Sequence, residues 1–306
     1  MTKVFIDGSA GTTGLRIHER LSARDDLTLL TLPEETRKDP AARREMLHTA
    51  DIAFLCLPDA AAKEAVALAE GSKVAIIDTS TAHRTDPAWV YGFAELGRRA
   101  AIATSNRVAN PGCHASGFLA LVEPLVKEGL IDPDTALSCF SITGYSGGGK
   151  QMIADYQSEG RGALLDAPRQ YGLVQTHKHL PEMCAVAGLT VPPIFCPVVA
   201  DFYSGMEVSV PLFAKDLRGT VQDVKALYAD VYRTPLLHYN DEPGESGMLS
   251  AAAYSGRDDM EVAVCGNAER AVLVARFDNL GKGASGAAIQ NMNILLGVDE
   301  CTGLVV

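Results

Sequence analysis

The 306-residue sequence predicts an α/β protein with a doubly wound parallel sheet, followed by an α+β domain built on a largely antiparallel sheet. Two observations carry this prediction. Short apolar strands alternate with helical patterns over the first 110 residues, and longer strand-like runs separated by Gly- and Pro-rich loops follow Gly112. A chain of this length exceeds what one hydrophobic core usually serves, so two domains are expected.

The elements of the first part follow from the spacing of apolar residues. Strands are predicted at residues 4–6, 27–32, 51–57 and 74–77, and helices at residues 13–23, 40–49 and 60–70. The first of these helices places Gly14, Ile17 and Leu21 on one face. Pro58 stops the third strand, and Gly71 stands where a helix C-cap prefers glycine.

The second part contains fewer helices and longer strands. Strands are predicted at residues 137–143, 194–199, 206–213 and 271–277, and helices at residues 115–128 and 221–232. A last helix, at residues 285–296, is expected to pack back on the first domain.

Composition excludes several classes of protein. The net charge of -11 argues against nucleic-acid binding, because a phosphate backbone requires a basic surface. The seven cysteines include no CxxC pair, so neither a disulfide framework nor a zinc knuckle is expected, and a reducing cytosol suits them. No apolar run reaches the ~18 residues of a membrane span, and the first residues do not resemble a signal peptide. A soluble, cytoplasmic protein is therefore predicted.

A glycine-rich turn follows the first strand, with Gly8, Gly11 and Gly14 at intervals of three. This GxxGxxG variant of the dinucleotide fingerprint allows a tight turn, close approach of a pyrophosphate and close packing of helix on strand. Such turns also join strands and helices without a ligand. The βαβ pattern that follows favours a Rossmann-type dinucleotide domain.

The second strand does not end in the acidic residue that usually binds the ribose in an NAD site. It is followed instead by a loop that contains Arg37 and Lys38, either of which could meet a 2′-phosphate. The alternative is that both are solvated loop charges. The sequence thus favours NADP over NAD.

Cys113 lies in the sequence NPGC (residues 110–113), which opens an apolar helix. The free N–H groups and the positive end of the helix dipole favour a thiolate there, and neighbouring amides could hold an oxyanion. A small apolar residue at a helix start is the alternative interpretation. Unlike most of the other cysteines, however, Cys113 lies in a polar turn, which favours a nucleophile.

A thiolate nucleophile needs a partner for proton transfer. His177 and His179 are two residues apart, so in an extended segment they face the same side. One could act as acid/base while the other binds substrate. A zinc pair is the competing interpretation, but no third ligand stands at a suitable spacing, and no metal is expected. Loops at residues 144–150 and 278–286, with Arg84 and Arg107, could supply the cations and amides that an anionic substrate requires.

Three separate motifs together resemble the N-acetyl-gamma-glutamyl-phosphate reductase family: NPGC at residues 110–113, HKHLPE at 177–182 and DNLGKGASGAAIQNMN at 278–293. Chain length, and His114 where many members carry an aromatic residue, resemble the short form of that family. The resemblance runs from the glycine-rich turn to the last helix.

The resemblance implies the two-domain fold of aspartate-semialdehyde and glyceraldehyde-phosphate dehydrogenases. An NADP-binding domain would comprise residues 1–112 and 284–306, and residues 113–283 would form a catalytic, substrate and oligomerisation domain. The implied reaction is the NADPH-dependent reductive dephosphorylation of N-acetyl-L-glutamyl 5-phosphate to N-acetyl-L-glutamate 5-semialdehyde, in arginine biosynthesis. Members of this fold assemble as dimers or tetramers, so a homo-oligomer is expected.

Site residues are carried over position by position. Cys113 matches the nucleophile and His179 the general acid/base, although the choice between His177 and His179 stays open. Substrate contacts are expected from His177, Glu182, Arg107, Ser146 and Lys150. Cofactor contacts are expected from Gly8, Ser9, Gly11, Thr12, Thr13, Gly14, Arg37, Lys38, Ser80, Asn279 and Lys282.

Three alternatives differ in their tests. An aspartate-semialdehyde dehydrogenase-like reductase of another acyl phosphate would prefer a shorter substrate. A cysteine-dependent hydrolase or acyltransferase would bind no dinucleotide. A regulatory NADP sensor would keep its function without Cys113.

Overall fold

The computed structural model describes residues 1–306, which form two compact units. The first unit comprises residues 1–111 and 284–304, and the second comprises residues 112–283 and 305–306. The last two residues join the second unit because Val305 exchanges two hydrogen bonds with Asp258. Its N–H donates to the Asp258 carboxylate at 2.9 Å, and its carbonyl accepts from the Asp258 N–H at 2.7 Å.

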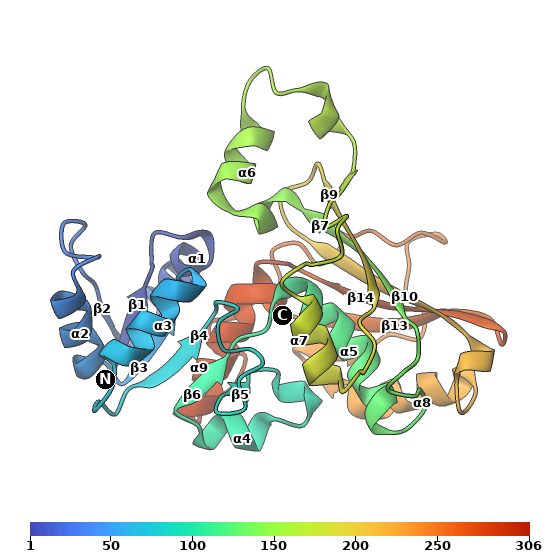
Figure 1. Ribbon diagram of the computed structural model, residues 1–306, viewed down its shortest axis with the longest axis horizontal. Coiled ribbons are helices and arrows are strands. Elements are labelled where there is room, and N and C mark those ends of the chain that lie inside the picture. Colours follow the sequence, from blue (N-terminus) through green and yellow to red (C-terminus); the bar gives the residue numbers. More distant parts are fainter. The chain divides into compact units, whose positions relative to one another are not determined.

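The first unit holds a six-stranded sheet of order β2-β1-β3-β4-β6-β5 in which every pair of neighbours is parallel (Figure 1). Its strands are β1 (Thr2–Asp7), β2 (Leu27–Leu30), β3 (Ile52–Leu55), β4 (Ala75–Asp78), β5 (Val90–Tyr91) and β6 (Arg107–Ala109). Its helices are α1 (Thr12–Leu21), α2 (Pro40–Thr49), α3 (Asp59–Leu68), α4 (Arg99–Thr104) and α9 (Gly286–Leu296), with the short turn η1 (Ala94–Leu96).

Two hydrophobic clusters cover this sheet, one on each face. Successive residues of a strand point to opposite faces, so the alternating residues of β1 separate between the clusters. One cluster joins Val4 and Ile6 to Ile17 of α1 and Ile289 of α9. The other joins Phe5 to residues of α2 and α3. The predicted doubly wound parallel sheet is therefore confirmed, as is the return of the last helix to the first domain.

The second unit holds an eight-stranded sheet of order β11-β12-β13-β14-β10-β7-β9-β8. Its strands are β7 (Ser138–Gly144), β8 (Arg169–Gln170), β9 (Ile194–Ala200), β10 (Met206–Phe213), β11 (Arg233–Thr234), β12 (Leu237–Tyr239), β13 (Met260–Gly266) and β14 (Arg270–Phe277). Only the pairs β7–β9 and β12–β13 are parallel, so the predicted largely antiparallel sheet is confirmed.

The second unit has four helices, the longest of which packs against one face of its sheet. They are α5 (Cys113–Lys127), α6 (Gly149–Gln157), α7 (Leu180–Ala187) and α8 (Val221–Val231), with the short turns η2 (Tyr145–Gly148), η3 (Ala163–Asp166), η4 (Ala214–Asp216) and η5 (Gly281–Ser285). Helix α5 packs closely on the sheet: a Cβ on Gly117 would lie 2.5 Å from the side chain of Val208. On the opposite face, Phe140 and Ile194 are 50% and 62% exposed.

The sequence prediction missed short elements and one long strand. Helices α4, α6 and α7 and strands β5, β6, β8, β11, β12 and β13 were not predicted, and most of them are short. The expected C-cap at Gly71 is wrong: α3 ends at Leu68 and its cap residue is Ala69. Gly71 instead supplies a positive φ of 81° in the turn that follows. No helix combines the length and the hydropathy that a membrane crossing requires.

Candidate active site

The glycine-rich turn after β1 is shaped by backbone contacts that exclude side chains. Gly8 has a φ of +91°, and a Cβ there would lie 2.3 Å from the carbonyl oxygen of Cys56. A Cβ on Gly14 would lie 2.4 Å from the carbonyl oxygen of Gly8. Gly11 is less confined, with its nearest contact at 3.4 Å, and it precedes α1 without a side-chain cap. The turn therefore has no room for side chains at Gly8 and Gly14, and no side chain caps the start of α1.

Other strand ends meet at the same edge of the sheet, where ligands of open α/β folds bind. Ser80 follows β4, and its hydroxyl donates to the buried carboxylate of Asp78 at 2.8 Å. The same carboxylate lies 2.6 Å from Nδ1 of His83, whose ring stacks on Trp89. The hydroxyl of Ser80 thus stabilises the turn after β4, at the same end of the sheet as the glycine-rich turn, and its contact with the cofactor stays a prediction.

Asp7 precedes the glycine-rich turn and pairs with the buried guanidinium of Arg43 at 2.9 Å. Burial raises the pKa of Asp7, while Arg43 opposes that shift. Arg37 and Lys38 lie exposed in the loop after β2, and Arg37 forms an ion pair with Glu34 at 2.6 Å. A cofactor 2′-phosphate would have to compete with Glu34 for Arg37.

Asn110 is the first residue of the cysteine turn (residues 110–113), and several groups of the first unit hold it. Its carbonyl accepts from Nε of Arg84 at 2.9 Å, and its side-chain amide donates to the carbonyl of Ala284 at 3.1 Å. Asn291 of α9 donates to Oδ1 of Asn110 at 3.2 Å. The C-terminal motif therefore anchors the chain just before Cys113.

Cys113 is the first residue of α5, and its cap residue Gly112 makes no side-chain cap. The N–H of Gly112 donates to Oε1 of Glu182 at 2.8 Å. The hydroxyl of Ser116 donates to the carbonyl of Gly112 at 3.0 Å. Glu182 thus holds the backbone just before Cys113, and the substrate contact expected of Glu182 stays a prediction.

His177 and His179 lie together in the second unit, with ring centroids 4.8 Å apart. The extended segment assumed from the sequence is wrong, because His179 has helical dihedral angles and caps α7. The turn brings the rings together, and the N–H of His179 donates to Nδ1 of His177 at 3.2 Å. Burial lowers the pKa of His177, with the charge of Lys178 adding to the effect. His179 is buried and His177 half-buried.

His114, which the sequence analysis left without a role, lies at the centre of this cluster. Its ring centroid is 5.8 Å from that of His177 and 5.5 Å from that of His179. Its Nδ1 is 2.7 Å from the hydroxyl of Ser141, and its Nε2 is 2.7 Å from the hydroxyl of Tyr171. Burial, with smaller contributions from His177 and Lys178, lowers the pKa of His114 to about 3.

The remaining predicted residues divide between the units. Ser146 and Asn279 bind each other in the second unit: the Asn279 amide donates to the Ser146 hydroxyl at 3.0 Å, and its oxygen accepts from the N–H of Gly205 at 2.9 Å. Lys282 is buried in η5, and Lys150 is exposed at the start of α6. Asn279 therefore has a visible structural role that the sequence did not indicate.

Arg107 lies at the opposite edge of the parallel sheet from the glycine-rich turn. It begins β6, and its guanidinium donates to the carbonyls of Val74 and Asn106 at 3.0 and 2.8 Å. The side chain thus binds strand ends of the first unit, and the substrate contact expected of Arg107 stays a prediction.

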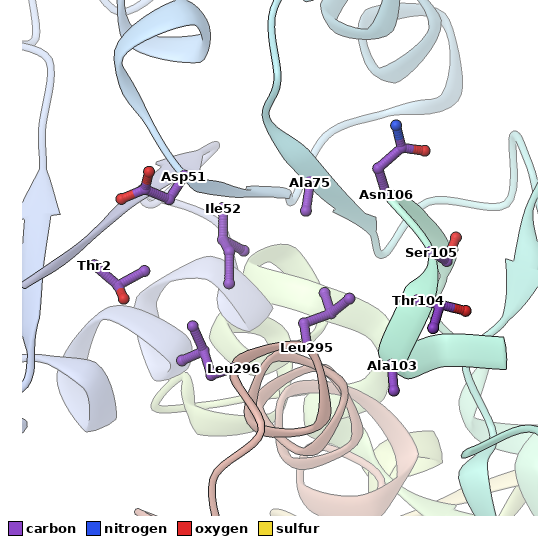
Figure 2. Close-up of a pocket in the computed structure, with 10 residues that line it drawn as sticks. All are labelled: Thr2, Asp51, Ile52, Ala75, Ala103, Thr104, Ser105, Asn106, Leu295 and Leu296. Carbon is purple, nitrogen blue, oxygen red and sulfur yellow. The ribbon is translucent and has the colours of Figure 1, made fainter. Parts of the chain in front are cut away.

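A pocket of about 560 Å³ lies at that same edge (Figure 2). It is lined by the first residues of several strands, among them Thr2, Ile52 and Ala75, and by Leu295 and Leu296 of α9. The amino ends of the strands form it, so it is separate from the glycine-rich turn at their carboxyl ends.

Sequence reasoning missed three sets of buried polar contacts: those of Ser141 and of Tyr171 with His114, and the Asp78–His83 pair. Their partners are between 5 and 57 residues away in the chain, and no local pattern marks them. One signal was available, since a histidine in the apolar start of a helix needs polar partners when it is buried.

The fold and the cysteine turn define a protein of the semialdehyde dehydrogenase class. A family model described as "Semialdehyde dehydrogenase, NAD binding domain" matches residues 33–105, and one described as "Semialdehyde dehydrogenase, dimerisation domain" matches residues 113–279. Among solved structures, aspartate semialdehyde dehydrogenase II from Vibrio cholerae has a TM-score of 0.73 at 17% identity, covering 97% of this chain and 98% of that one. Aspartate semialdehyde dehydrogenase from Francisella tularensis has a TM-score of 0.72 at 15% identity, covering 97% and 100%.

Curated relatives narrow the class. The chain is 44% identical to N-acetyl-gamma-glutamyl-phosphate reductase 2 of Nostoc sp., over 99% of both chains. It is 46% identical to N-acetyl-gamma-glutamyl-phosphate reductase 2 of Pseudomonas putida, over 98% of both, and 46% identical to the Brucella ovis reductase, over 96% and 99%. The protein belongs to the N-acetyl-gamma-glutamyl-phosphate reductase family, as the sequence motifs predicted.

Proposed function

We propose that this protein reduces N-acetyl-L-glutamyl 5-phosphate to N-acetyl-L-glutamate 5-semialdehyde with NADPH, releasing phosphate, in arginine biosynthesis. The observation that carries the proposal is the cysteine turn: Cys113 opens α5 without a side-chain cap on Gly112, and Glu182 fixes the preceding amide. A nucleophile in that position gains from the free N–H groups and the dipole of the helix. Family membership at 44–46% identity supplies the substrate.

The first half of the reaction is acyl transfer to Cys113. The thiolate attacks the acyl carbon, a C–S bond forms, and the C–O bond to phosphate breaks as phosphate leaves with the bonding electrons. The product is a thioester, whose carbonyl stays open to a second nucleophile because sulfur stabilises the acyl group poorly. Backbone amides at the start of α5 stabilise the oxyanion.

NADPH, when bound, supplies the hydride that reduces the thioester carbon. His179 then donates a proton to the resulting oxyanion. It takes the proton back as the aldehyde carbonyl forms, the C–S bond breaks and Cys113 regains its thiolate. His177 supports this role, because its Nδ1 accepts from the N–H of His179 and so fixes the turn that carries both rings.

The glycine-rich turn fits the cofactor. Gly8 and Gly14 have no room for a Cβ, and Gly11 leaves the start of α1 open to a pyrophosphate. The residues that would hold it there are Gly8, Ser9, Gly11, Thr12, Thr13, Gly14 and Ser80. Arg37 and Lys38 would meet the 2′-phosphate, with Arg37 exchanging Glu34 for the ligand.

A second copy of the chain covers the open face of the second-unit sheet. Phe140 and Ile194 are 50% and 62% exposed on neighbouring strands of that face, and Ile142 continues the apolar surface. The matched family model for residues 113–279 is described as a dimerisation domain. Light scattering of Ile142→Asp should therefore show a smaller particle than the wild type, and an unchanged mass would contradict this assembly. The cytoplasm, where thiols stay reduced, is the compartment that suits Cys113.

The test of the activity runs the reaction in reverse, because the acyl phosphate is unstable. Purified protein receives N-acetyl-glutamate semialdehyde, phosphate and NADP, and reduced nicotinamide is followed by absorbance. Parallel reactions contain aspartate semialdehyde or lack phosphate. We expect sustained turnover only with phosphate and a preference for the acetylated aldehyde. Turnover with aspartate semialdehyde alone would favour the sister reaction, and none with either aldehyde would contradict the reductase.

A further inference from the structure

We propose that Tyr171 donates a hydrogen bond to the acyl oxygen of the substrate beside Cys113, and that Ser141 and His114 set the direction of its hydroxyl. The inference rests on the proposed function, because the acyl oxygen belongs to the group that Cys113 attacks. It adds a catalytic residue, Tyr171, and two positioning residues to that reaction.

Three segments of the second unit build this chain of hydrogen bonds. Ser141 lies on β7, His114 follows Cys113 at the start of α5, and Tyr171 follows β8. The imidazole of His114 bridges the two hydroxyls, with 2.7 Å on each side. The chain of hydrogen bonds thus passes through the residue next to Cys113, and the rings of His177 and His179 lie beside it.

Tyr171 is held in place independently of His114. Its N–H donates to the carbonyl of Pro197 in β9 at 3.0 Å. Four residues later, the side chain of Gln175 bonds both the carbonyl and the N–H of Phe195, at 2.8 and 2.9 Å. Gln175 adopts a positive φ of 56° to make this clamp. The backbone that carries Tyr171 is therefore held by the sheet, and the role left to His114 is to set where the hydroxyl proton points.

The direction of the proton follows from burial. The pKa of His114 is held at about 3, so the imidazole is neutral and carries one N–H. Ser141 is fully buried and its hydroxyl contacts Nδ1 of His114, and a buried hydroxyl proton without an acceptor is costly. Ser141 therefore donates to Nδ1, and the N–H sits on Nε2 and donates to Tyr171.

This polarity leaves the Tyr171 proton for an acceptor other than His114. Burial, followed by the negative charge of the nearby Cys113 thiolate, raises the pKa of Tyr171, so the phenol keeps its proton. When Cys113 adds to the acyl carbon, the C=O electrons move onto oxygen next to Sγ. A neutral donor on the hydroxyl beside His114, the chain neighbour of Cys113, would stabilise that charge without transferring a proton.

Kinetics of Tyr171→Phe test the donor. We expect kcat in the reverse assay to fall about 100-fold with little change in KM, as for loss of one oxyanion donor. Tyr232→Phe is the matched control, because it also removes a buried hydroxyl, one that donates to the carbonyl of Ala120 in α5 at 2.5 Å. Wild-type kcat in Tyr171→Phe would overturn the proposal.

A double-mutant cycle tests the positioning residues. Ser141→Ala and His114→Phe should each lower kcat when Tyr171 is present, and neither should lower it further in the Tyr171→Phe background. Effects that multiply would show that these residues act through the fold rather than through the tyrosine hydroxyl. Ser141→Ala serves if His114→Phe does not fold.

A measurement without substrate separates this inference from the proposed function. Nitrogen-15 NMR of labelled histidines should show His114 as the Nε2–H tautomer at pH 7, with its Nε2 signal shifted in Tyr171→Phe. The Nδ1–H tautomer would overturn the assigned direction whatever the enzyme does. A wild type without phosphate-dependent turnover would contradict the function and the acyl acceptor together. An active wild type matched by Tyr171→Phe would contradict the inference alone.

Discussion

The glycine-rich turn of the first unit and the cysteine turn of the second are built on different principles. Gly8 and Gly14 shape their turn by lacking side chains, against backbone atoms of Cys56 and Gly8 itself. The cysteine turn depends on side chains from elsewhere: Glu182 holds the amide of Gly112 across 70 residues. The spacing of the glycines is visible in a sequence, whereas the distant partner of a side chain is not. Substitutions in each of the two turns test this difference.

The largest effect is expected at the nucleophile. Cys113→Ser should lower kcat about 1,000-fold or more. The serine hydroxyl stays protonated where the cysteine forms a thiolate, so it is a much weaker nucleophile. NADP affinity should stay at the wild-type value, because the glycine-rich turn is untouched. Turnover and a cofactor titration on the same preparation check both statements. Retained turnover would mean that another group is the nucleophile.

Glu182 tests whether the cysteine turn depends on its distant anchor. Glu182→Ala should lower kcat on the order of 100-fold, since a displacement of about 1 Å at a reacting group can cost that much. Glu182→Gln keeps an oxygen in reach of the Gly112 N–H and should recover most of the activity. Equal losses in both variants would point instead to a role for the negative charge.

The lowered pKa of His114 makes the free energy of unfolding depend on pH. Its pKa is about 3 in the folded protein against 6.5 ordinarily, so between these values the unfolded chain binds a proton that the folded chain does not. The free energy of unfolding therefore falls as pH drops below 6.5. Between pH 7 and 5 the wild type should lose about 2 kcal/mol more than His114→Phe, measured by urea unfolding. Parallel losses would contradict a neutral, buried His114.

The glycine-rich turn offers the smallest but most local test. Gly8→Ala places a Cβ against the carbonyl of Cys56, so NADP affinity should fall at least about tenfold, or 1.4 kcal/mol. Gly71→Ala is the matched control: it shares a positive φ, +81°, but no atom lies within 4 Å of its Cβ. That variant should lose some stability and bind NADP normally. A similar loss of affinity in both would mean that steric exclusion at Gly8 is not what shapes the cradle.

Features that neighbouring residues determine could be predicted from the sequence, and contacts between distant residues could not. The alternation of strands and helices, the turn at Gly8 and the position of Cys113 at a helix start all depend on neighbours in the chain, and the predicted fold class was confirmed. The pairing of His177 with His179 was expected for the wrong reason, because the segment is a turn rather than extended.

The contacts that the sequence did not indicate share a cause. Arg107 was chosen for its charge alone, and its guanidinium binds carbonyls at the amino ends of the strands. Asn279 was expected to meet the cofactor, but its amide bridges Ser146 and Gly205. Tyr171 was not considered, because only the fold brings it to His114, 57 residues away. Roles that depend on packing between distant segments need the structure.

The most direct test of the account is to trap the acyl group on the enzyme. Protein is mixed with N-acetyl-glutamate semialdehyde and NADP in the absence of phosphate, so that the thioester forms but cannot be released as acyl phosphate. We predict a burst of one reduced nicotinamide per active site, and an N-acetylglutamyl adduct that peptide mass spectrometry places on Cys113. No burst, or an adduct on another residue, would contradict covalent reduction through Cys113.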